Sequence, residues 1–227
     1  SGQRLYDYAN TVLSEYDKLK KEIDMIRASE EGTVELLVAY DILRYLTPDC
    51  ILEFQKKYPN VTFSYMEYPD RIVEKMLLDK EGNVALSIGP FAGDCFDMKS
   101  LKKCSLGLLV YEGHSLAKKR EATILDLEGE PLYLENSSFK LNEFIQSRCW
   151  NRGFEPDIVF ETNGFDLCYK MCRLKRGISV TIDFVHEDMN TEGLVMIPFA
   201  EDDMIWEIGL LTLKDRAMEL SLIHISE

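Results

Sequence analysis

The sequence lacks the short motifs that mark common catalytic and nucleotide-binding sites. It contains no G-x-S-x-G, no P-loop, no H-E-x-x-H and no G-x-G-x-x-G. Its three histidines, His114, His186 and His224, lie far apart with no partner pattern beside them. We therefore expect a protein that is not an enzyme.

Long apolar runs are also missing. No stretch approaches the roughly 20 apolar residues that a membrane helix needs, and the first residues lack the apolar core of a secretion signal. Glycine and proline are few, at 13 and 7 residues, while 46% of the chain is apolar, which indicates a globular protein. We expect a cytoplasmic chain with no membrane partner that forms one large domain or two small ones.

Basic residues are scarce relative to acidic ones. The chain has 26 Lys and Arg against 40 Asp and Glu, a net charge of −14. Because contacts to phosphate groups supply much of the affinity for nucleic acids, this chain is not expected to bind DNA by itself. A small molecule or another protein is the expected direct partner.

Six cysteines are present, and we expect them to be buried, reduced thiols, since no secretion signal is seen. Cys168 and Cys172 are four residues apart and would share one helix face. No second Cys or His pair stands beside them, so neither a metal nor another cofactor is expected.

A long helical pattern occupies residues 3–28. Its apolar positions are spaced alternately by four and three residues, as in the seam of a coiled coil. This pattern predicts a dimerisation helix, in a homodimer or a homotetramer, although an amphipathic helix packed on its own domain would show similar spacing. The seam residues are Leu5, Ala9, Val12, Tyr16, Leu19, Ile23 and Ile26.

Residues 32–66 read as strand, turn, helix and strand, which is one βαβ unit. A helix at 71–78 and a strand at 84–88, apolar apart from Ser87, continue the series, and strand patterns follow at 101–110, 193–198 and 204–213. A second series of alternating strands and helices is predicted at 132–134, 140–152, 158–161, 165–174 and 178–182. Two such series predict two α/β domains with a cleft between them.

Several predicted strands end in small or polar residues, namely Tyr40-Asp41, Ser87, Asn136-Ser137-Ser138 and Thr181. In an open α/β sheet, ligands usually bind outside the carboxyl ends of the strands. Helix N-termini at such turns also offer backbone N–H groups to an anion. The alternative is that these residues only form turns and helix caps.

Motifs along nearly the whole chain, in order and spacing, resemble those of LysR-type transcriptional regulators. The run at 32–66 is similar to that family's G-x-L-x-I…L-P-x-x-L-x-x-F-x-x-x-Y-P-x-V, here with Thr47-Pro48, Phe54, Tyr58-Pro59 and Val61. Further matches are His114-Ser-Leu-Ala117 to H-P-L-A, Glu130-Pro131-Leu132 to e-P-l, Lys175-Arg-Gly-Ile178 to G-x-G-I, and Trp206-Glu-Ile208 to W-x-I.

The resemblance implies an α/β fold with two subdomains of the type II periplasmic-binding-protein fold, joined by two crossing strands and preceded by a long linker helix. Residues 1–31 would be the linker and dimerisation helix, 32–106 with 199–227 the first effector-binding subdomain, and 107–198 the second. DNA would be bound only through a winged helix-turn-helix domain that is absent from this sequence. A small-molecule effector would contact Ala39, Tyr40, Asp41, Pro69, Asp70, Asn136, Ser137, Ser138 and Phe199.

Two residues of this predicted site differ from the family pattern. Tyr40 stands near a position where the family often has Ser or Thr, and Asp41 is acidic. Both differences count against a carboxylate effector, although backbone N–H groups remain available. A solute-binding protein of a transport system with the same fold is the alternative function, against which the missing signal, the cysteines and the heptad helix all argue.

Overall fold

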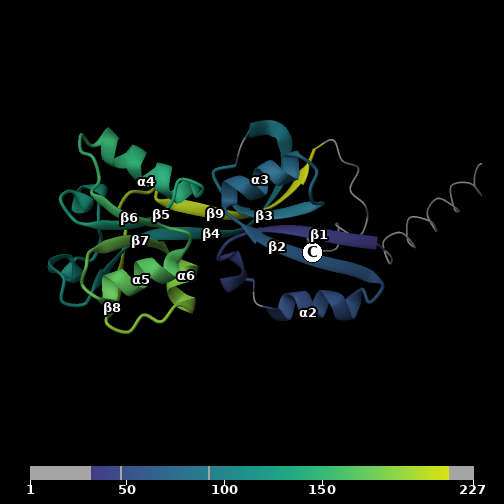
Figure 1. The fold of residues 1–227 in the computed structure, drawn as a ribbon, viewed down its shortest axis with the longest axis horizontal. Coiled ribbons are helices and arrows are strands. Elements are labelled where there is room, and N and C mark those ends of the chain that lie inside the picture. Colours follow the sequence, from purple (N-terminus) through teal and green to yellow (C-terminus); the bar gives the residue numbers. More distant parts are fainter. Residues whose placement is uncertain (1–31, 47, 92, 215–227) are drawn as a thin grey trace, which may run out of the picture.

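The computed structural model describes residues 32–46, 48–91 and 93–214, which form two α/β lobes joined by long strands (Figure 1). The predicted linker helix and its seam residues lie outside these ranges. No helix in the described ranges is long and apolar enough to cross a membrane. The first lobe consists of β1 (Gly32–Ala39), the 3-10 helix η1 (Ile42–Arg44), α2 (Pro48–Lys57), β2 (Val61–Tyr68), α3 (Asp70–Leu78) and β3 (Val84–Ile88).

The second lobe repeats the alternation of strands and helices. The 3-10 helices η3 (Ser115–Lys118) and η4 (Ile124–Leu127) lead into it, after η2 (Gly93–Cys95) in the first half of the chain. Its elements are β5 (Leu132–Glu135), α4 (Lys140–Asn151), β6 (Ile158–Thr162), α5 (Phe165–Arg173), β7 (Ile178–Ile182), α6 (Asp183–Asp188) and β8 (Leu194–Pro198).

Two long strands, β4 (Phe96–Tyr111) and β9 (Ile205–Leu213), run through the centre of the molecule (Figure 1). The first part of β4 pairs with β9 in the sheet of the first lobe, while its end pairs with β7 and β8 in the second. The chain returns beside this crossing, where the N–H of Phe199 donates to the carbonyl of Leu106 (3.3 Å). The strand order is β2-β1-β3-β9-β4-β7-β5-β6.

The inner strands are buried on both faces because helices cover the sheet. Every residue of β3 and of β7 is buried, as expected for parallel strands in a doubly covered sheet. Helix α3 supplies Val73 and Leu77, both without exposed surface, to the core of the first lobe. The cysteines only partly follow the prediction: Cys50 and Cys95 are exposed, whereas the other four are buried free thiols.

Helix α6 was not predicted from the sequence. Its first residue, Asp183, accepts a hydrogen bond from the N–H of Phe184 (2.6 Å) through one carboxylate oxygen. The other oxygen accepts from the N–H of Ser105 on β4 (2.9 Å). The start of α6 therefore depends on a strand almost 80 residues earlier, a contact that no local pattern reveals.

Candidate functional site

A small cavity lies where the two lobes meet. Its volume is about 10 Å³, about the space of one water molecule. The first lobe contributes Ala39, Tyr40, Asp41, Asp70 and Ile88, the second contributes Glu135, Phe139, Phe165 and Ile182, and β9 contributes Trp206. We call it the central cavity. It lies at the carboxyl ends of β1, β3, β5 and β7, where an open α/β sheet usually binds its ligand.

The turn after β1 forms one wall of the central cavity. The N–H of Tyr40 donates to the carbonyl of Tyr68 (3.0 Å), which fixes the turn to the end of β2. The Tyr40 ring packs against that of Phe139 in the second lobe, with centroids 6.1 Å apart. Asp41 follows with a positive φ of 68°, a backbone conformation that Asp adopts more readily than most residues.

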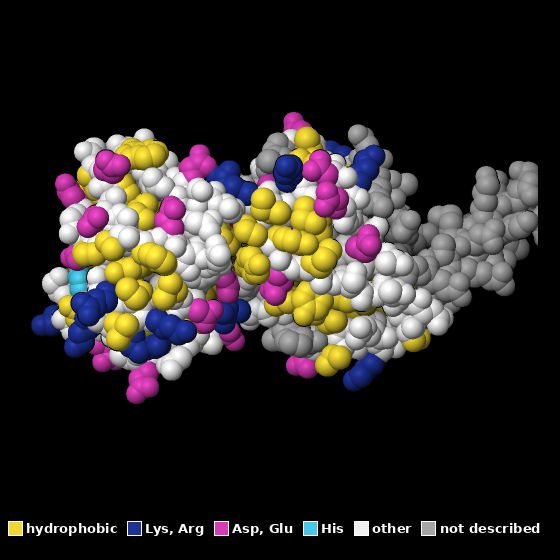
Figure 2. All heavy atoms as spheres, in the orientation of Figure 1, with side chains coloured by type: hydrophobic (Ala, Val, Ile, Leu, Met, Phe, Trp, Pro, Cys, Tyr) yellow, Lys and Arg dark blue, Asp and Glu magenta, His cyan; other side chains and the backbone are white. Residues whose placement is uncertain are grey.

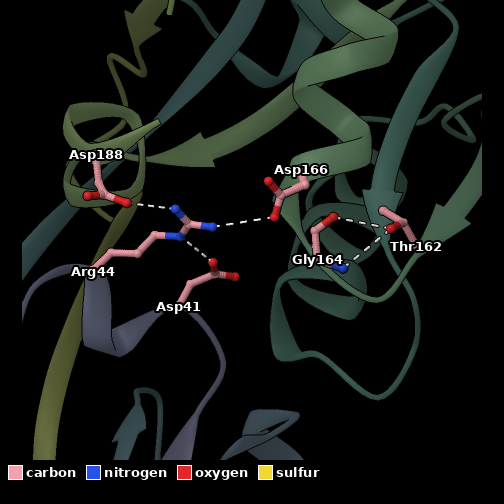
Figure 3. Close-up of polar contacts among 6 residues, drawn as sticks. All are labelled: Asp41, Arg44, Thr162, Gly164, Asp166 and Asp188. Carbon is pink, nitrogen blue, oxygen red and sulfur yellow. Dashed lines mark hydrogen bonds and ion pairs between the residues drawn. The ribbon is translucent and has the colours of Figure 1, made fainter. Parts of the chain in front are cut away.

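Arg44 connects the two lobes at the mouth of this cavity (Figure 3). Its Nε lies 2.5 Å from Asp41, and its two terminal nitrogens lie 2.6 Å from Asp188 and 3.4 Å from Asp166. Burial alone would lower the pKa of the Arg44 guanidinium, but its hydrogen bonds to Asp41 and Asp188 raise that pKa above the ordinary value. We call these four residues the Arg44 cluster.

Asp70 holds the two lobes together from the other side of the cavity. Its carboxylate accepts the N–H of Arg71 (2.6 Å) and, across the cleft, the N–H of Lys140 (3.1 Å) at the start of α4. Burial raises the pKa of Asp70 to about 6, although the Lys140 charge and these hydrogen bonds oppose the shift. A carboxylate of the protein itself thus occupies the helix N-terminus at which the sequence suggested an anion could bind.

Lys140 is a cation of the second lobe whose charge acts on Asp70, but that charge is already paired. Its Nζ contacts a carboxylate oxygen of Glu74 and donates to the carbonyl of Ile88 (2.6 Å). Glu74 also accepts from the hydroxyl of Ser87 (3.1 Å). Both charged side chains of this pair are largely buried, and Lys140 is not among the described residues that line the central cavity.

Two groups that line the central cavity lack partners. The Glu135 side chain is 4% exposed, and its carboxyl makes no hydrogen bond within the described ranges. Burial, and then the charges of Asp41 and Asp70, raise the pKa of Glu135 well above its ordinary value. The indole Nε1 of Trp206, in a side chain that is 3% exposed, is also buried without a partner there. Buried polar groups are nearly always hydrogen-bonded. In the described ranges Oε2 of Glu201 is also buried without a partner, but that residue does not line the central cavity, whereas Glu135 and Trp206 do.

An open outer cleft of about 510 Å³ adjoins the central cavity and shares Tyr40 and Asp41 with it. The Arg44 cluster lines it together with Glu67, whose pKa is raised first by burial and then by the charge of Asp41. On the face that Figure 2 shows, acidic and basic side chains both border the waist between the lobes. Among the described residues that line the outer cleft, four carboxyl groups face the single guanidinium of Arg44, so this lining is predominantly acidic.

The structure brings together four of the nine ligand-binding residues predicted from the sequence: Ala39, Tyr40, Asp41 and Asp70 line the central cavity. The carbonyl of Pro69 accepts the N–H groups of the first turn of α3. The other four belong to neither lining set. Of these, Asn136 accepts the N–H of Ser138 (2.8 Å) in a local turn, Ser137 is exposed, and Phe199 is half-buried beside the crossing strands.

The sequence reasoning did not select Glu135, Phe139, Arg44 or Trp206. Only Glu135 carries a local signal, because an acidic residue ends the otherwise apolar run of β5. In the described part of the chain, no three His, Cys, Asp or Glu side chains are grouped in a way that could hold a metal ion.

The family model for the LysR substrate binding domain matches residues 27–222. An uncharacterized HTH-type transcriptional regulator of Bacillus subtilis, YwbI, is 26% identical over 174 residues, and these cover 77% of this chain but only 58% of that regulator. The solute-transport alternative gains no support from these relatives.

Two solved structures show the same fold. The regulatory domain of CcmR from Synechocystis PCC6803 superposes with a TM-score of 0.76 at 15% identity, over 86% of this chain and 96% of that one. The BenM effector binding domain superposes with a TM-score of 0.72 at 19% identity, over 86% and 90% of the two chains. The predicted two-lobed fold of the type II periplasmic-binding-protein class is thereby confirmed. The chain belongs to the LysR substrate-binding domain family, the ligand-sensing part of regulators of this type.

Proposed function

We propose that this chain senses a small-molecule effector in the central cavity and passes the resulting change in lobe packing to a DNA-binding domain. The observation that carries the proposal is the pair of buried, unpartnered groups, Glu135 and Trp206, that line one inter-lobe cavity. A ligand that satisfies both groups favours one arrangement of the lobes. It shifts the equilibrium by the difference between its affinities for the two arrangements.

Related domains support this proposal by the ligands with which they were solved. The BenM effector binding domain was solved with its effector benzoate, and the CcmR regulatory domain in complex with 2-PG. We propose that Ala39, Tyr40, Asp41 and Asp70, with Glu135 and Trp206, form the effector site here. Pro69, Asn136, Ser137, Ser138 and Phe199 stay in the proposal as residues that contact an effector when the lobes separate.

The remaining organisation follows from the same proposal. Residues 32–106 with 199–227 would form one effector-binding subdomain, and 107–198 the other. Residues 1–31 would pair two subunits in a homodimer or homotetramer and connect to a winged helix-turn-helix domain. The protein would act in the cytoplasm as a transcriptional regulator without catalytic activity, and DNA would be contacted only through that additional domain.

Thermal unfolding of this chain in the presence of individual metabolites tests the proposal. We expect a compound that binds the cavity to raise the melting temperature of the wild type. Its effect should be strongly reduced by Tyr40→Ala, which removes the ring between the lobes, and unchanged by Glu128→Gln, at an exposed residue outside both cavities. A compound that stabilises both variants equally would show that the effector binds elsewhere.

The regulatory step requires a second measurement. In a full-length regulator that carries this sequence, Tyr40→Ala should reduce the transcriptional response to the same compound while operator binding without the compound persists. An unchanged response would contradict the proposed role of the cavity in signalling.

A further inference from the structure

We propose that the effector is a small organic cation, a primary amine that also carries an oxygen acceptor. This inference rests on the proposed function and adds the chemical class of the ligand. The ammonium group would bind between Glu135 and Asp41, and the oxygen would accept the N–H of Trp206.

The first argument is the charge of the cavity wall. Three carboxyl groups, those of Asp41, Asp70 and Glu135, line the central cavity, and within the described part of the chain no Lys, Arg or His lines it. The backbone N–H of Lys140, which could have held an anion, already donates to Asp70. An anionic ligand would therefore oppose the ionisation of these carboxyl groups in a desolvated space, whereas a cation would favour their ionised form and be attracted to it.

The second argument is independent of charge and comes from the missing hydrogen bonds. The Glu135 carboxyl is buried without a partner in the described ranges, so an ammonium donor would supply the bond that it lacks. The Trp206 indole can only donate, so the ligand must also offer an acceptor. One compound with an ammonium group and an oxygen would satisfy both groups at once.

The third argument is that the protein already places a cation of its own at the entrance. The Arg44 guanidinium meets carboxylates from three elements: Asp41 before η1, Asp166 on α5 and Asp188 on α6 (Figure 3). The second oxygen of Asp41 adds no bond in the described structure. A cation bound deeper in the cavity would use that oxygen while Arg44 keeps its contacts to the second lobe.

The small volume of the central cavity means that the lobes must move before a ligand can bind. About 10 Å³ is too little for any amine, so the lobes must separate before binding. Separation exposes Glu135 and Trp206 to a ligand that arrives through the acidic outer cleft. A cation would be concentrated there by the surplus of carboxylates over the single guanidinium among the residues that line this cleft in the described ranges.

The number of protons released or taken up on binding distinguishes a cationic ligand from an anionic one. Glu135 faces Asp41 and Asp70, and Asp70 is also near Lys140 and Glu74. These carboxyls hold protons at higher pH than usual, so a cation must displace protons when it binds. We therefore expect protons to be released on binding and the affinity to rise as the pH is raised above the ordinary carboxyl range. An anion would bind with the opposite dependence.

The test uses this 227-residue chain and a panel of primary amines of up to about eight non-hydrogen atoms, each with a hydroxyl, carbonyl or amide oxygen. Every amine is measured beside two analogues of matched shape, in which a hydroxyl or a carboxylate replaces the ammonium group; 4-aminobutan-1-ol, butane-1,4-diol and 4-hydroxybutanoate form one such set. Thermal unfolding finds binders, and calorimetry in buffers of different ionisation enthalpy measures the proton release.

The expected result is that one or more amines raise the melting temperature while their neutral and acidic analogues do not. Glu135→Gln should weaken the binding of that amine by about tenfold or more, because the ion pair between the Glu135 carboxylate and the ligand ammonium is lost. Glu128→Gln, an exposed residue outside both cavities, should leave it unchanged. Asp41→Asn serves as the second cavity variant if Glu135→Gln does not fold.

Other outcomes overturn the inference in distinguishable ways. Binding of the carboxylate analogues, with proton uptake, would refute the cationic class and leave the proposed function intact. If Mg²⁺ or Ca²⁺ stabilises the wild type and Glu135→Gln abolishes that effect, the ligand is a metal ion and not an amine. If no amine, acid or neutral metabolite binds, both the inference and the proposed effector site are refuted.

Discussion

Removal of the Arg44 guanidinium tests how the lobes are held together. Arg44→Met keeps the aliphatic bulk but leaves Asp41, Asp166 and Asp188 without their shared cation. The side chains of Asp166 and Asp188 are 70% and 49% exposed, so each of these pairs contributes about 0–1 kcal/mol. The Asp41 side chain is only 11% exposed, and a buried carboxylate that loses its partner costs more, about 2 kcal/mol here.

The expected loss of unfolding free energy for Arg44→Met is therefore about 3 kcal/mol near neutral pH. For a chain of this size, that loss corresponds to a fall in melting temperature of roughly 8 °C. Arg71→Met is the matched control, because Arg71 also connects the lobes, to Glu143, but both side chains are exposed. Its expected cost is at most about 1 kcal/mol.

The pH dependence identifies Asp41 as the origin of this loss. Burial already raises the pKa of Asp41, and Arg44 opposes that shift, so the pKa rises further in Arg44→Met. A raised carboxyl pKa in the folded state means that stability is lost as the pH rises above the ordinary value of about 4. The penalty should thus shrink on acidification, and Asp41→Asn in the same variant should remove most of it at neutral pH. Chemical denaturation at several pH values measures both effects; a penalty that is independent of pH, or one that Asp41→Asn leaves intact, would refute the reasoning.

Two further substitutions test the interior of the lobe interface, and a third tests the packing of β5 against β7 within the second lobe. The pKa of Asp70 is raised to about 6, so the wild type should lose about 3 kcal/mol of unfolding free energy at this group as the pH rises from about 4 to 6. Asp70→Asn should remove this pH dependence, as measured by denaturation curves at several pH values. Glu74→Gln leaves the Lys140 ammonium buried without its anion and should cost about 3 kcal/mol or more by the same assay, unless the ammonium reaches water. Gly177→Ala would place a Cβ 2.1 Å from the carbonyl oxygen of Pro131. We expect this clash to lower the free energy of unfolding by about 2–4 kcal/mol, measured by thermal unfolding. A smaller loss would show that β5 and β7 move apart to make room for the methyl group.

The elements that the sequence predicts best are those whose burial is nearly uniform. The strands at 84–88 and 178–182 agree with β3 and β7 at both ends, because apolar residues begin and end both of them, and only Ser87, Ser179 and Thr181 interrupt the apolar runs. In contrast, the predicted strand at 101–110 is part of the longer β4, which begins at Phe96. Its first residues are mostly exposed, and their extended conformation follows from pairing with β9, which lies about 100 residues later in the chain.

The residues of the candidate site also fall into those that the sequence predicts and those that it does not. Strand ends can be located from sequence, and the carboxyl ends of parallel strands meet at one edge of a sheet, which brought Ala39, Tyr40 and Asp41 into the prediction. Whether a polar side chain finds a hydrogen-bond partner is decided only by the tertiary structure. Glu135 and Trp206 are therefore invisible in the sequence as site residues, although the lack of partners in the described structure is what distinguishes them.

The arrangement of charges explains why an effector of the proposed class would alter the lobe packing. In the closed form, Asp41 serves two functions, since it lines the central cavity and pairs with the guanidinium that binds Asp166 and Asp188. A cation beside Asp41 weakens the hold of that carboxylate on Arg44 and at the same time removes the cost of ionising Glu135 next to it. The ligand charge thus acts on the inter-lobe contacts directly, whereas a neutral compound of the same shape has no such differential effect and can shift the lobes only by its volume.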